Sequence, residues 1–239
     1  MLLFIEVLRD TYNFHLNGNF PDDPDSKSLL LYSGFLEQLF KSKSVLEKAK
    51  NKSILKIVTG TNTNPIVARE VIDFALSSLK DAHSSMSRSS YKNIIEAMSN
   101  TNNHAYEKNQ NIKKWYLMAL YDEKSNKVSF AFSDNGHGII ATVKKRNHEK
   151  FGMASHTTIL ESALKGSIYN RSQTNLEERG KGLPSINSSF KRGHTDNLVI
   201  IANKAYYNVK NDEKIRLKHS FKGTLISWDF IKGEKDEKN

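Results

Sequence analysis

Hydrophobic residues recur along the chain with two spacings, one typical of helices and the other of strands. In residues 65–79 apolar side chains recur every three or four positions, and Asn64 followed by Pro65 is a typical helix start. Residues 87–106 repeat the helical spacing. Shorter helices are predicted at residues 26–35, 157–168 and 182–192, the first of them closed by Gly34.

Apolar and polar residues alternate instead in residues 115–122 and 127–134, which predicts two strands joined by a hairpin turn. Further strands are predicted at residues 53–60, 197–203 and 223–230, whereas residues 141–180 have no regular pattern outside their one helix. We expect an α+β fold: a two-layer sandwich in which helices cover one face of a mixed, mostly antiparallel sheet.

The first part of the chain does not belong obviously to this plan. Residues 1–60 are therefore interpreted as a small N-terminal segment or domain fragment of unknown function, and residues 61–239 as the main domain. The apolar start is too short to span a bilayer and lacks the basic residues of a signal peptide. The chain has no cysteine, which excludes disulfides and thiolate metal sites and favours a reducing compartment. We expect a cytoplasmic protein.

Positive charge is concentrated in the second half of the sequence. The formal net charge is +10, and residues 141–239 hold 19 Lys and Arg against 11 Asp and Glu. Such an excess suggests an anionic partner, although a solvated surface would give the same composition. Nucleic acid is a possible partner but is not favoured, because no aromatic residues alternate with the arginines. No membrane partner is expected, and the oligomeric state stays open.

The strand at residues 127–134 ends on a carboxylate, Asp134, followed by Gly136 and Gly138 one residue apart. A carboxylate at the end of a strand is suited to accept a hydrogen bond from an amine deep in a pocket, and glycines allow the backbone to approach a flat ring closely. By itself this stretch is also typical of an ordinary turn, so both interpretations stay open.

Three polar side chains share one face of the helix predicted at residues 87–106. Glu96, Asn100 and His104 are spaced by four residues. An amide oxygen suits Mg²⁺, and a glutamate one turn away could activate a hydroxyl. A solvent-facing polar stripe would have the same spacing.

Two later stretches contain glycines at the start of predicted elements. Gly180, Lys181 and Gly182 lead into the helix at residues 182–192, where backbone N–H groups and the lysine would attract phosphate. The alternative is a glycine-rich loop with a helix cap. Thr224 follows a glycine at the start of the last strand, which is uninformative alone.

Together, in this order, the four stretches resemble the motifs of the GHKL superfamily of ATP-binding proteins: E-x-x-x-N-x-x-x-H from Glu96, D-x-G-x-G-I from Asp134, G-x-G-L-x-x-I from Gly180, and G-T ending at Thr224. The first motif is most similar to that of the anti-sigma-factor kinases. The resemblance covers residues 61–232 and leaves residues 1–60 outside.

The resemblance implies the Bergerat fold, with ATP and Mg²⁺ held between the sheet and a lid. Asn100 would bind Mg²⁺, Glu96 would be the general base, and Asp134 would accept the adenine amine. The remaining nucleotide contacts would come from His104, Gly136, Gly138, Ile139, Gly180, Lys181, Gly182, Leu183 and Thr224. The basic run 144–146 would touch phosphate or face water, and we favour water.

The expected function is that of a Mg-dependent ATP-binding protein that hydrolyses ATP slowly and couples lid closure to binding of a regulatory protein. Slow hydrolysis is expected because the phosphate-contacting lysine of gyrase and MutL has no counterpart after Thr224. His83 lacks the flanking residues of a phosphoacceptor histidine. The alternatives are a serine/threonine protein kinase of the anti-sigma-factor type, and a non-catalytic module gated by nucleotide.

Overall fold

The structure is a computed structural model of the chain, and it describes residue 14 and residues 18–40, 53–79, 84–104, 114–167 and 182–231. Its helices are α2 (Pro24–Tyr32), α3 (Phe35–Phe40), α4 (Pro65–Ser78), α5 (Ser84–His104), α6 (Ile139–Arg146), α7 (His148–Phe151), α8 (His156–Lys165) and α9 (Gly182–Lys191). Its strands are β1 (Ile54–Gly60), β2 (Trp115–Asp122), β3 (Lys127–Asp134), β4 (Asp196–Asn208) and β5 (Glu213–Ile231).

The strands form one sheet in the order β1-β2-β3-β5-β4, and every pairing between described strands is antiparallel. The α+β class and the largely antiparallel sheet are thus confirmed. The sheet was expected to be mixed, but the described strands form no parallel pair. β1 is the edge strand and pairs with β2, so the sheet begins before the expected domain boundary at residue 61.

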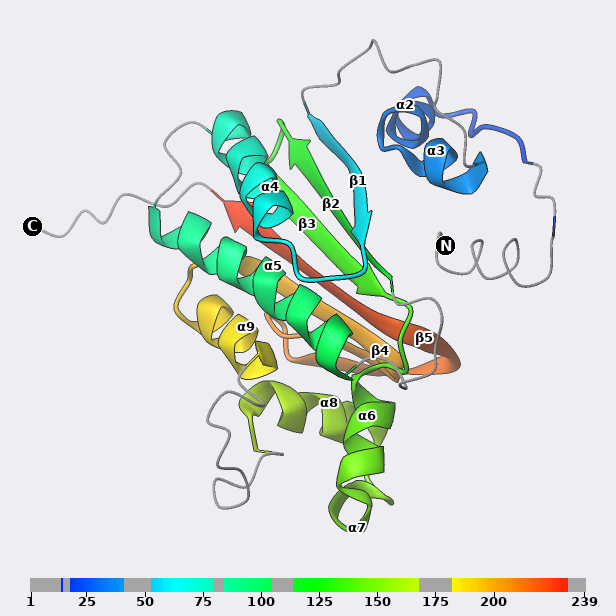
Figure 1. Cartoon of the computed structure of the whole chain (residues 1–239), viewed down its shortest axis with the longest axis vertical. Helices are drawn as coiled ribbons and strands as arrows, with labels where there is room; N and C mark the ends of the chain where they lie inside the picture. Colours follow the sequence, from blue (N-terminus) through cyan, green and yellow to red (C-terminus); the bar gives the residue numbers. More distant parts are fainter. Residues whose placement is uncertain are drawn as a thin grey trace, which may run out of the picture.

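Helices α4, α5 and α9 lie across the same face of this sheet, and α6, α7 and α8 gather near the end where β3 stops (Figure 1). The start of α4 follows the sequence prediction, because the side chain of Asn64 accepts hydrogen bonds from the N–H groups of Ile66 at 3.0 Å and Val67 at 3.2 Å. The two layers of the expected sandwich are therefore a sheet and one helical layer.

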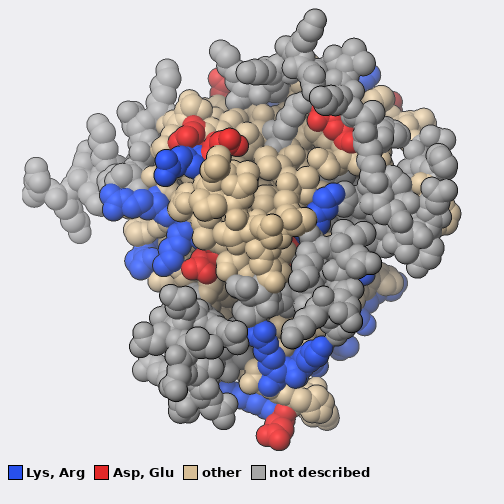
Figure 2. All heavy atoms as spheres, in the orientation of Figure 1, with Lys and Arg blue, Asp and Glu red and all other residues tan. Residues whose placement is uncertain are grey.

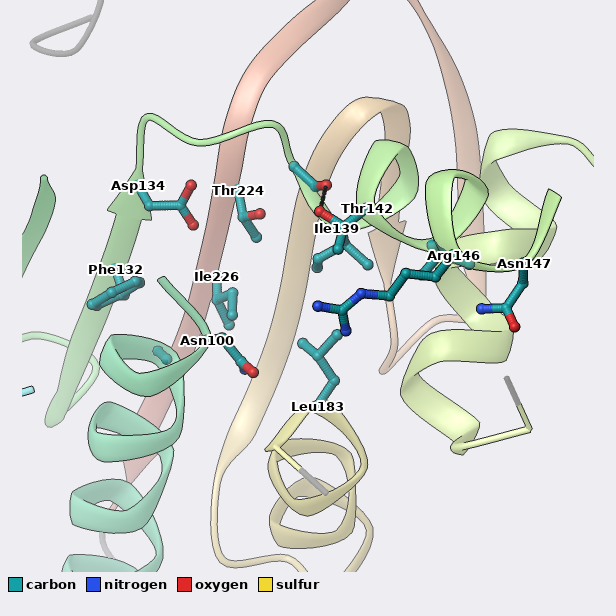
Figure 3. A pocket seen from close by; sticks show the side chains of 13 residues that line it. Asn100, Phe132, Asp134, Ile139, Thr142, Arg146, Asn147, Leu183, Thr224 and Ile226 are labelled. Atoms are coloured by element: carbon teal, nitrogen blue, oxygen red, sulfur yellow. Dashed lines mark hydrogen bonds between the residues drawn. The ribbon is translucent and has the colours of Figure 1, made fainter. Parts of the chain in front are cut away.

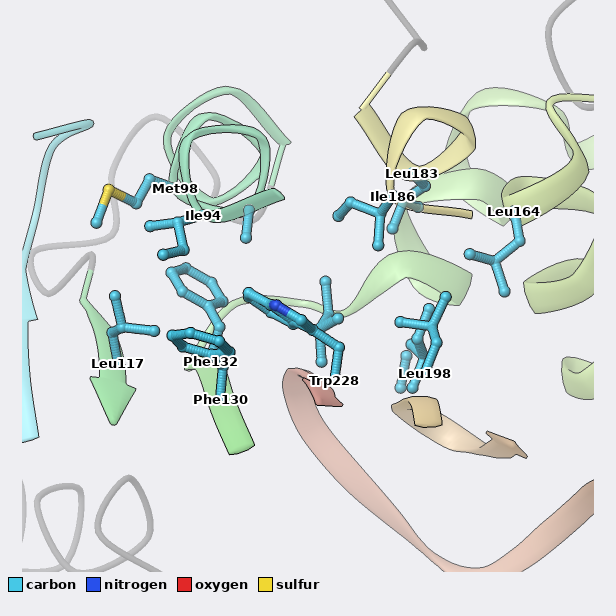
Figure 4. Packing of buried hydrophobic residues seen from close by; sticks show 14 of the residues in the cluster. Ile94, Met98, Leu117, Phe130, Phe132, Leu164, Leu183, Ile186, Leu198 and Trp228 are labelled. Carbon is cyan, nitrogen blue, oxygen red and sulfur yellow. The ribbon is translucent and has the colours of Figure 1, made fainter. Parts of the chain in front are cut away.

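The core lies between the sheet and α5, and strand alternation builds it. Every second residue of β3 is buried, from Val128 to Asp134. The rings of Phe130 and Trp228 stack with their centroids 5.3 Å apart, under Ile94 of α5 (Figure 4). Trp115 stacks on Phe132 at 6.1 Å. Burying large aromatic side chains in this way is the main stabilisation that the fold receives.

The hairpin of β4 and β5 is sharply bent. Its bend lies where Asn203, with φ of 51°, stands near Gly223, with φ of 100°. The bend brings the turn end of the hairpin back toward the start of β4. There the N–H of Val209 donates to the carbonyl of Leu198 at 2.9 Å. A Cβ on Gly223 would overlap the carbonyl oxygen of Asp134, so this position requires glycine for space as well as for conformation.

The strands predicted at residues 197–203 and 223–230 correspond to the near half of this hairpin only. The stretch predicted as irregular holds two further helices, α6 and α7, and α6 begins directly after Gly138. Over the residues that the structure describes, no helix combines the length and apolar character needed to cross a membrane.

Candidate functional site

A cavity opens where the end of β3, α5, α6 and α9 meet. It contains about 650 Å³ of empty space, counted out to the solvent at its mouth. Six apolar or small residues form its sides: Ala97, Phe132, Ile139, Val143, Leu183 and Ile226. Polar residues stand at its ends, namely Asn100, Asp134, Thr142, Arg146, Asn147 and Thr224, together with Gly138 (Figure 3). An apolar slot with polar groups at its ends is typical of a site for a flat, partly polar small molecule.

Asp134 is a carboxylate at the closed end of the cavity. It is only 5% exposed, and this burial raises its pKa to about 6. The N–H of Gly136 and the N–H and hydroxyl of Thr224 act in the opposite direction and lower the pKa. One carboxylate oxygen, Oδ1, accepts the Gly136 N–H at 2.8 Å. Asp134 therefore holds its own turn and also lines the cavity, so the two interpretations do not exclude each other.

The loop after Asp134 is fixed by a residue that sequence reasoning missed, Asn203 of β4. Its amide Nδ2 donates to the carbonyl of His137 at 2.8 Å, and its Oδ1 accepts the N–H of Ala141 at 3.2 Å. Gly138 supplies no side-chain cap for α6, so Asn203 caps that helix from a distant strand. A Cβ on Gly138 would lie 2.6 Å from the Asn203 Oδ1, which is why the second glycine of the motif is needed.

On the opposite side, Glu96 and Asn100 of α5 face the first residue of α9, Gly182. A Cβ at Gly182 would stand 2.8 Å from Asn100 Nδ2 and 3.0 Å from Glu96 Oε2, so the glycine leaves a small space into which both side chains converge. The Asn100 Nδ2 is buried and has no hydrogen-bond partner among the described residues. Both residues are half-buried, which excludes the alternative of a fully solvated stripe.

Arg146 and Asn147, at the end of α6, form the mouth of the cavity. The guanidinium of Arg146 reaches into the cavity above Leu183 (Figure 3). Arg146 of the basic run 144–146 is exposed, as predicted, and it also lines the rim of the cavity. Its place follows from α6, a helix that the sequence pattern did not indicate; one turn of helix aligns Arg146 with Thr142 and Val143 on the cavity side.

Six of the predicted site residues line this one cavity: Asn100, Asp134, Gly138, Ile139, Leu183 and Thr224. Glu96 and Gly182 adjoin it through Asn100, and Gly136 contributes its N–H to Asp134. His104 is the last residue of α5, and its side chain is not among those that the structure describes. The predictions for His83, Gly180 and Lys181 fall on residues outside the described ranges.

The donor set decides what kind of metal ion the cavity suits. Within the described ranges, no three His, Asp or Glu side chains come together as a metal site. A single amide such as Asn100 fits an ion that takes most of its oxygen ligands from a bound phosphate and from water, as Mg²⁺ does. The same arrangement does not suit an ion that the protein must hold unaided.

Comparison with models of known protein families gives no match, and comparison with curated proteins gives none either. Function is therefore inferred from the geometry of the cavity and from the order of the motifs that supply its residues.

Proposed function

We propose that the cavity binds ATP with Mg²⁺ and that the protein is a slow ATPase of the GHKL type. The observation that carries the proposal is the convergence, in one cavity, of residues separated by up to 124 positions in the sequence, from Asn100 to Thr224. Together these residues represent all four stretches of the motif series, and each stretch by itself had an ordinary structural explanation.

The shape and chemistry of the cavity support adenine as the base. Phe132 and Ile226 on the sheet and Ile139 on α6 are apolar surfaces that fit the faces of a purine. Asp134 lies at the end of this slot, and a carboxylate only accepts hydrogen bonds when it is ionised. It would therefore select an exocyclic amine, as in adenine, over a carbonyl, as in guanine.

The other end of the cavity supports a polyphosphate. Arg146 supplies a positive charge at the mouth, and a guanidinium is suited to bidentate contact with phosphate. Gly182 begins α9, whose first N–H groups point toward the same region. Asn100 would bind Mg²⁺ through its side-chain oxygen, which would leave its buried Nδ2 as a donor for the bound ligand. Glu96, facing the same space around Gly182, would accept the proton of an attacking water.

The proposal is tested by calorimetric titration with a non-hydrolysable ATP analogue and with the matching GTP analogue, each with and without Mg²⁺. We expect binding of the ATP analogue only, weakened when Mg²⁺ is removed. Asp134→Asn should weaken binding at least 100-fold, because an amide presents a donor to the adenine amine. Asp122→Asn, at the opposite end of the same hairpin, is the matched control and should bind normally.

The catalytic part has a separate test in the rate of phosphate release. Glu96→Ala should abolish release while leaving analogue affinity within about threefold, because a general base acts on the attacking water rather than on the nucleotide. Glu70→Ala, an exposed glutamate of α4, is the control. Equal rates in both variants would remove Glu96 from the chemistry, and equal affinity for ATP and GTP would reject Asp134 as the base-reading group.

A further inference from the structure

Positive side chains gather on one outer surface, formed by α6, the start of α8 and the bent β4–β5 hairpin. We call this surface the basic ribbon and define it as five cations, Lys144, Lys204, Arg216, Lys218 and Lys222, together with the imidazole of His219. In Figure 2 the Lys and Arg atoms run from α6 along the lower edge of the molecule toward the hairpin, which Figure 1 shows there. None of the six lines the cavity.

Three cations of the basic ribbon, Lys144, Lys204 and Arg216, act electrostatically on His156, the first residue of α8. The N–H of Lys204 donates to Nδ1 of His156 at 3.2 Å. Burial lowers the pKa of His156, and the charges of Lys144, Arg216 and Lys204 lower it further. Among the described residues, no carboxylate is one of the groups that shift this pKa. Three cations near one imidazole repel each other, and an anion at this point would relieve that repulsion.

Elsewhere in the same hairpin, lysines are paired with carboxylates. Lys210 lies 2.7 Å from Asp196, and Lys214 lies 2.9 Å from Asp212 and 3.1 Å from Glu161. Within the described ranges, Lys204, Arg216, Lys218 and Lys222 make no such pair. The fold thus neutralises the turn of the hairpin and leaves its middle positive.

The backbone of β5 explains how these cations become exposed. Its register with β4 jumps from Asn203↔Phe221 to Ala205↔Arg216, so residues 217–220 stand opposite Lys204 alone. This irregularity interrupts the pairing, and such interruptions re-aim side chains. Lys218, His219 and Ser220 are all exposed there.

We propose that the basic ribbon binds the phosphodiester backbone of a nucleic acid. Its exposed side chains are cations with hydroxyl groups among them, from Ser155 and Ser220, which are the donors that phosphate oxygens take. A protein interface would need an apolar anchor near its centre. Two large apolar residues of this region are exposed, Met153 and Ile215. Ile215 precedes Arg216 in the strand and therefore points to the opposite face. Met153 follows Gly152, whose carbonyl accepts a hydrogen bond from Lys144 Nζ at 3.3 Å, so it is a single apolar side chain beside the α6 end of the ribbon.

This inference goes beyond the proposed function and does not require it, because the basic ribbon and the cavity share no residue. The two are nevertheless adjacent. α6 contributes Lys144 to the ribbon and Arg146 to the cavity, and β5 contributes Lys222 to the ribbon and Thr224 to the cavity. A ligand that moved α6 would therefore also move one of the phosphate contacts.

The test is fluorescence anisotropy of the full chain with a labelled 20-nucleotide DNA, single-stranded and as a duplex, between 50 and 200 mM salt. If the five Lys and Arg of the ribbon each contact a duplex phosphate, the logarithm of the affinity should fall with the logarithm of salt with a slope of roughly −4.5. Changing Arg216, Lys218 and Lys222 to Gln together should reduce the slope to roughly −1.8.

The matched control removes the same charge elsewhere: Lys92, Lys191 and Arg192, all exposed on α5 and at the end of α9, are changed to Gln. It should keep the wild-type slope, and both triple variants should unfold at the wild-type temperature. Equal slopes in the two variants would overturn the proposal. So would equal competition by polyglutamate or by vesicles containing phosphatidylserine, which would identify an acidic protein or a membrane as the partner class.

The outcome is also distinguishable from failure of the proposed function. The ribbon variant should bind the ATP analogue as the wild type does, because Arg216, Lys218 and Lys222 lie outside the cavity. DNA binding without nucleotide binding would support the inference and reject the ATPase. Nucleotide binding without DNA binding would do the reverse.

Discussion

Replacing Asp134 by Asn should favour the folded protein, relative to the wild type at the same pH, more at neutral pH than at acid pH. Asp134 is a buried carboxyl whose pKa in the fold is about 6, while the ordinary value is 3.8. The folded protein therefore holds this proton more tightly than the unfolded chain does. The stabilisation that protonation gives is fully present below pH 3.8 and is lost as the pH rises through 6.

The magnitude follows from the difference between the two pKa values. A shift of about 2 pKa units corresponds to roughly 3 kcal/mol, since one unit is worth 1.36 kcal/mol. Asn cannot titrate, so the stability of Asp134→Asn minus that of the wild type should rise by roughly 2.4 kcal/mol between pH 4 and pH 8, since pH 4 already lies above the unfolded pKa. Other titrating groups are common to both proteins and largely cancel in this difference. The lost contacts with Thr224 lower the curve uniformly without changing its slope.

The assay is unfolding in guanidinium chloride at several pH values, followed by the fluorescence of Trp115 and Trp228, which are 1% and 0% exposed. A difference that stays constant from pH 4 to pH 8 would refute the reasoning, because it would show that Asp134 titrates alike in the folded and unfolded chains. A difference that falls with pH would show that donors rather than burial dominate its environment.

Substitutions at three further positions test particular contacts. Gly182→Ala should change the free energy of unfolding by no more than about 1 kcal/mol, because the atoms nearest the new methyl are the movable ends of Asn100 and Glu96. The same change should abolish phosphate release. An unchanged rate of release would contradict this. Gly223→Ala should destabilise by about 3 kcal/mol or more in urea unfolding, because its methyl meets backbone at a φ of 100°. Asn203→Ala should lower the free energy of unfolding by about 2 kcal/mol, because it loses both hydrogen bonds and strains a left-handed backbone. Asn203→Gly should lower it less, because glycine loses the same hydrogen bonds but adopts that backbone conformation readily. Equal losses of stability would show that backbone strain plays no part.

Local patterns were sufficient for the central part of the fold. The hairpin of β2 and β3 has the predicted bounds, since its alternation is regular and its turn is short. The start of α4 was visible in Asn64 and Pro65, whose chemistry acts within one helical turn. In both cases the residues that determine the structure are close together in the sequence.

The missed parts depend on contacts between distant residues. α6 lacks a capping residue of its own and takes its cap from Asn203, 62 residues away from Ala141. The far half of the β4–β5 hairpin is polar and exposed along much of β5, so the alternation that marks a buried strand is absent. Arg146 reaches the mouth of the cavity only because α6 forms, so its place was not predictable from its position in a basic run.

The tertiary cap provided by Asn203 also has a consequence for local opening of the protein. Fraying of the bent hairpin would withdraw the acceptor from the Ala141 N–H and the donor from the His137 carbonyl, so α6 and the adjoining loop would lose order in the same event. Amide protons of these three segments should then exchange with solvent deuterium at a common rate. A small molecule that closes the cavity would slow exchange along a hairpin most of whose residues it never touches.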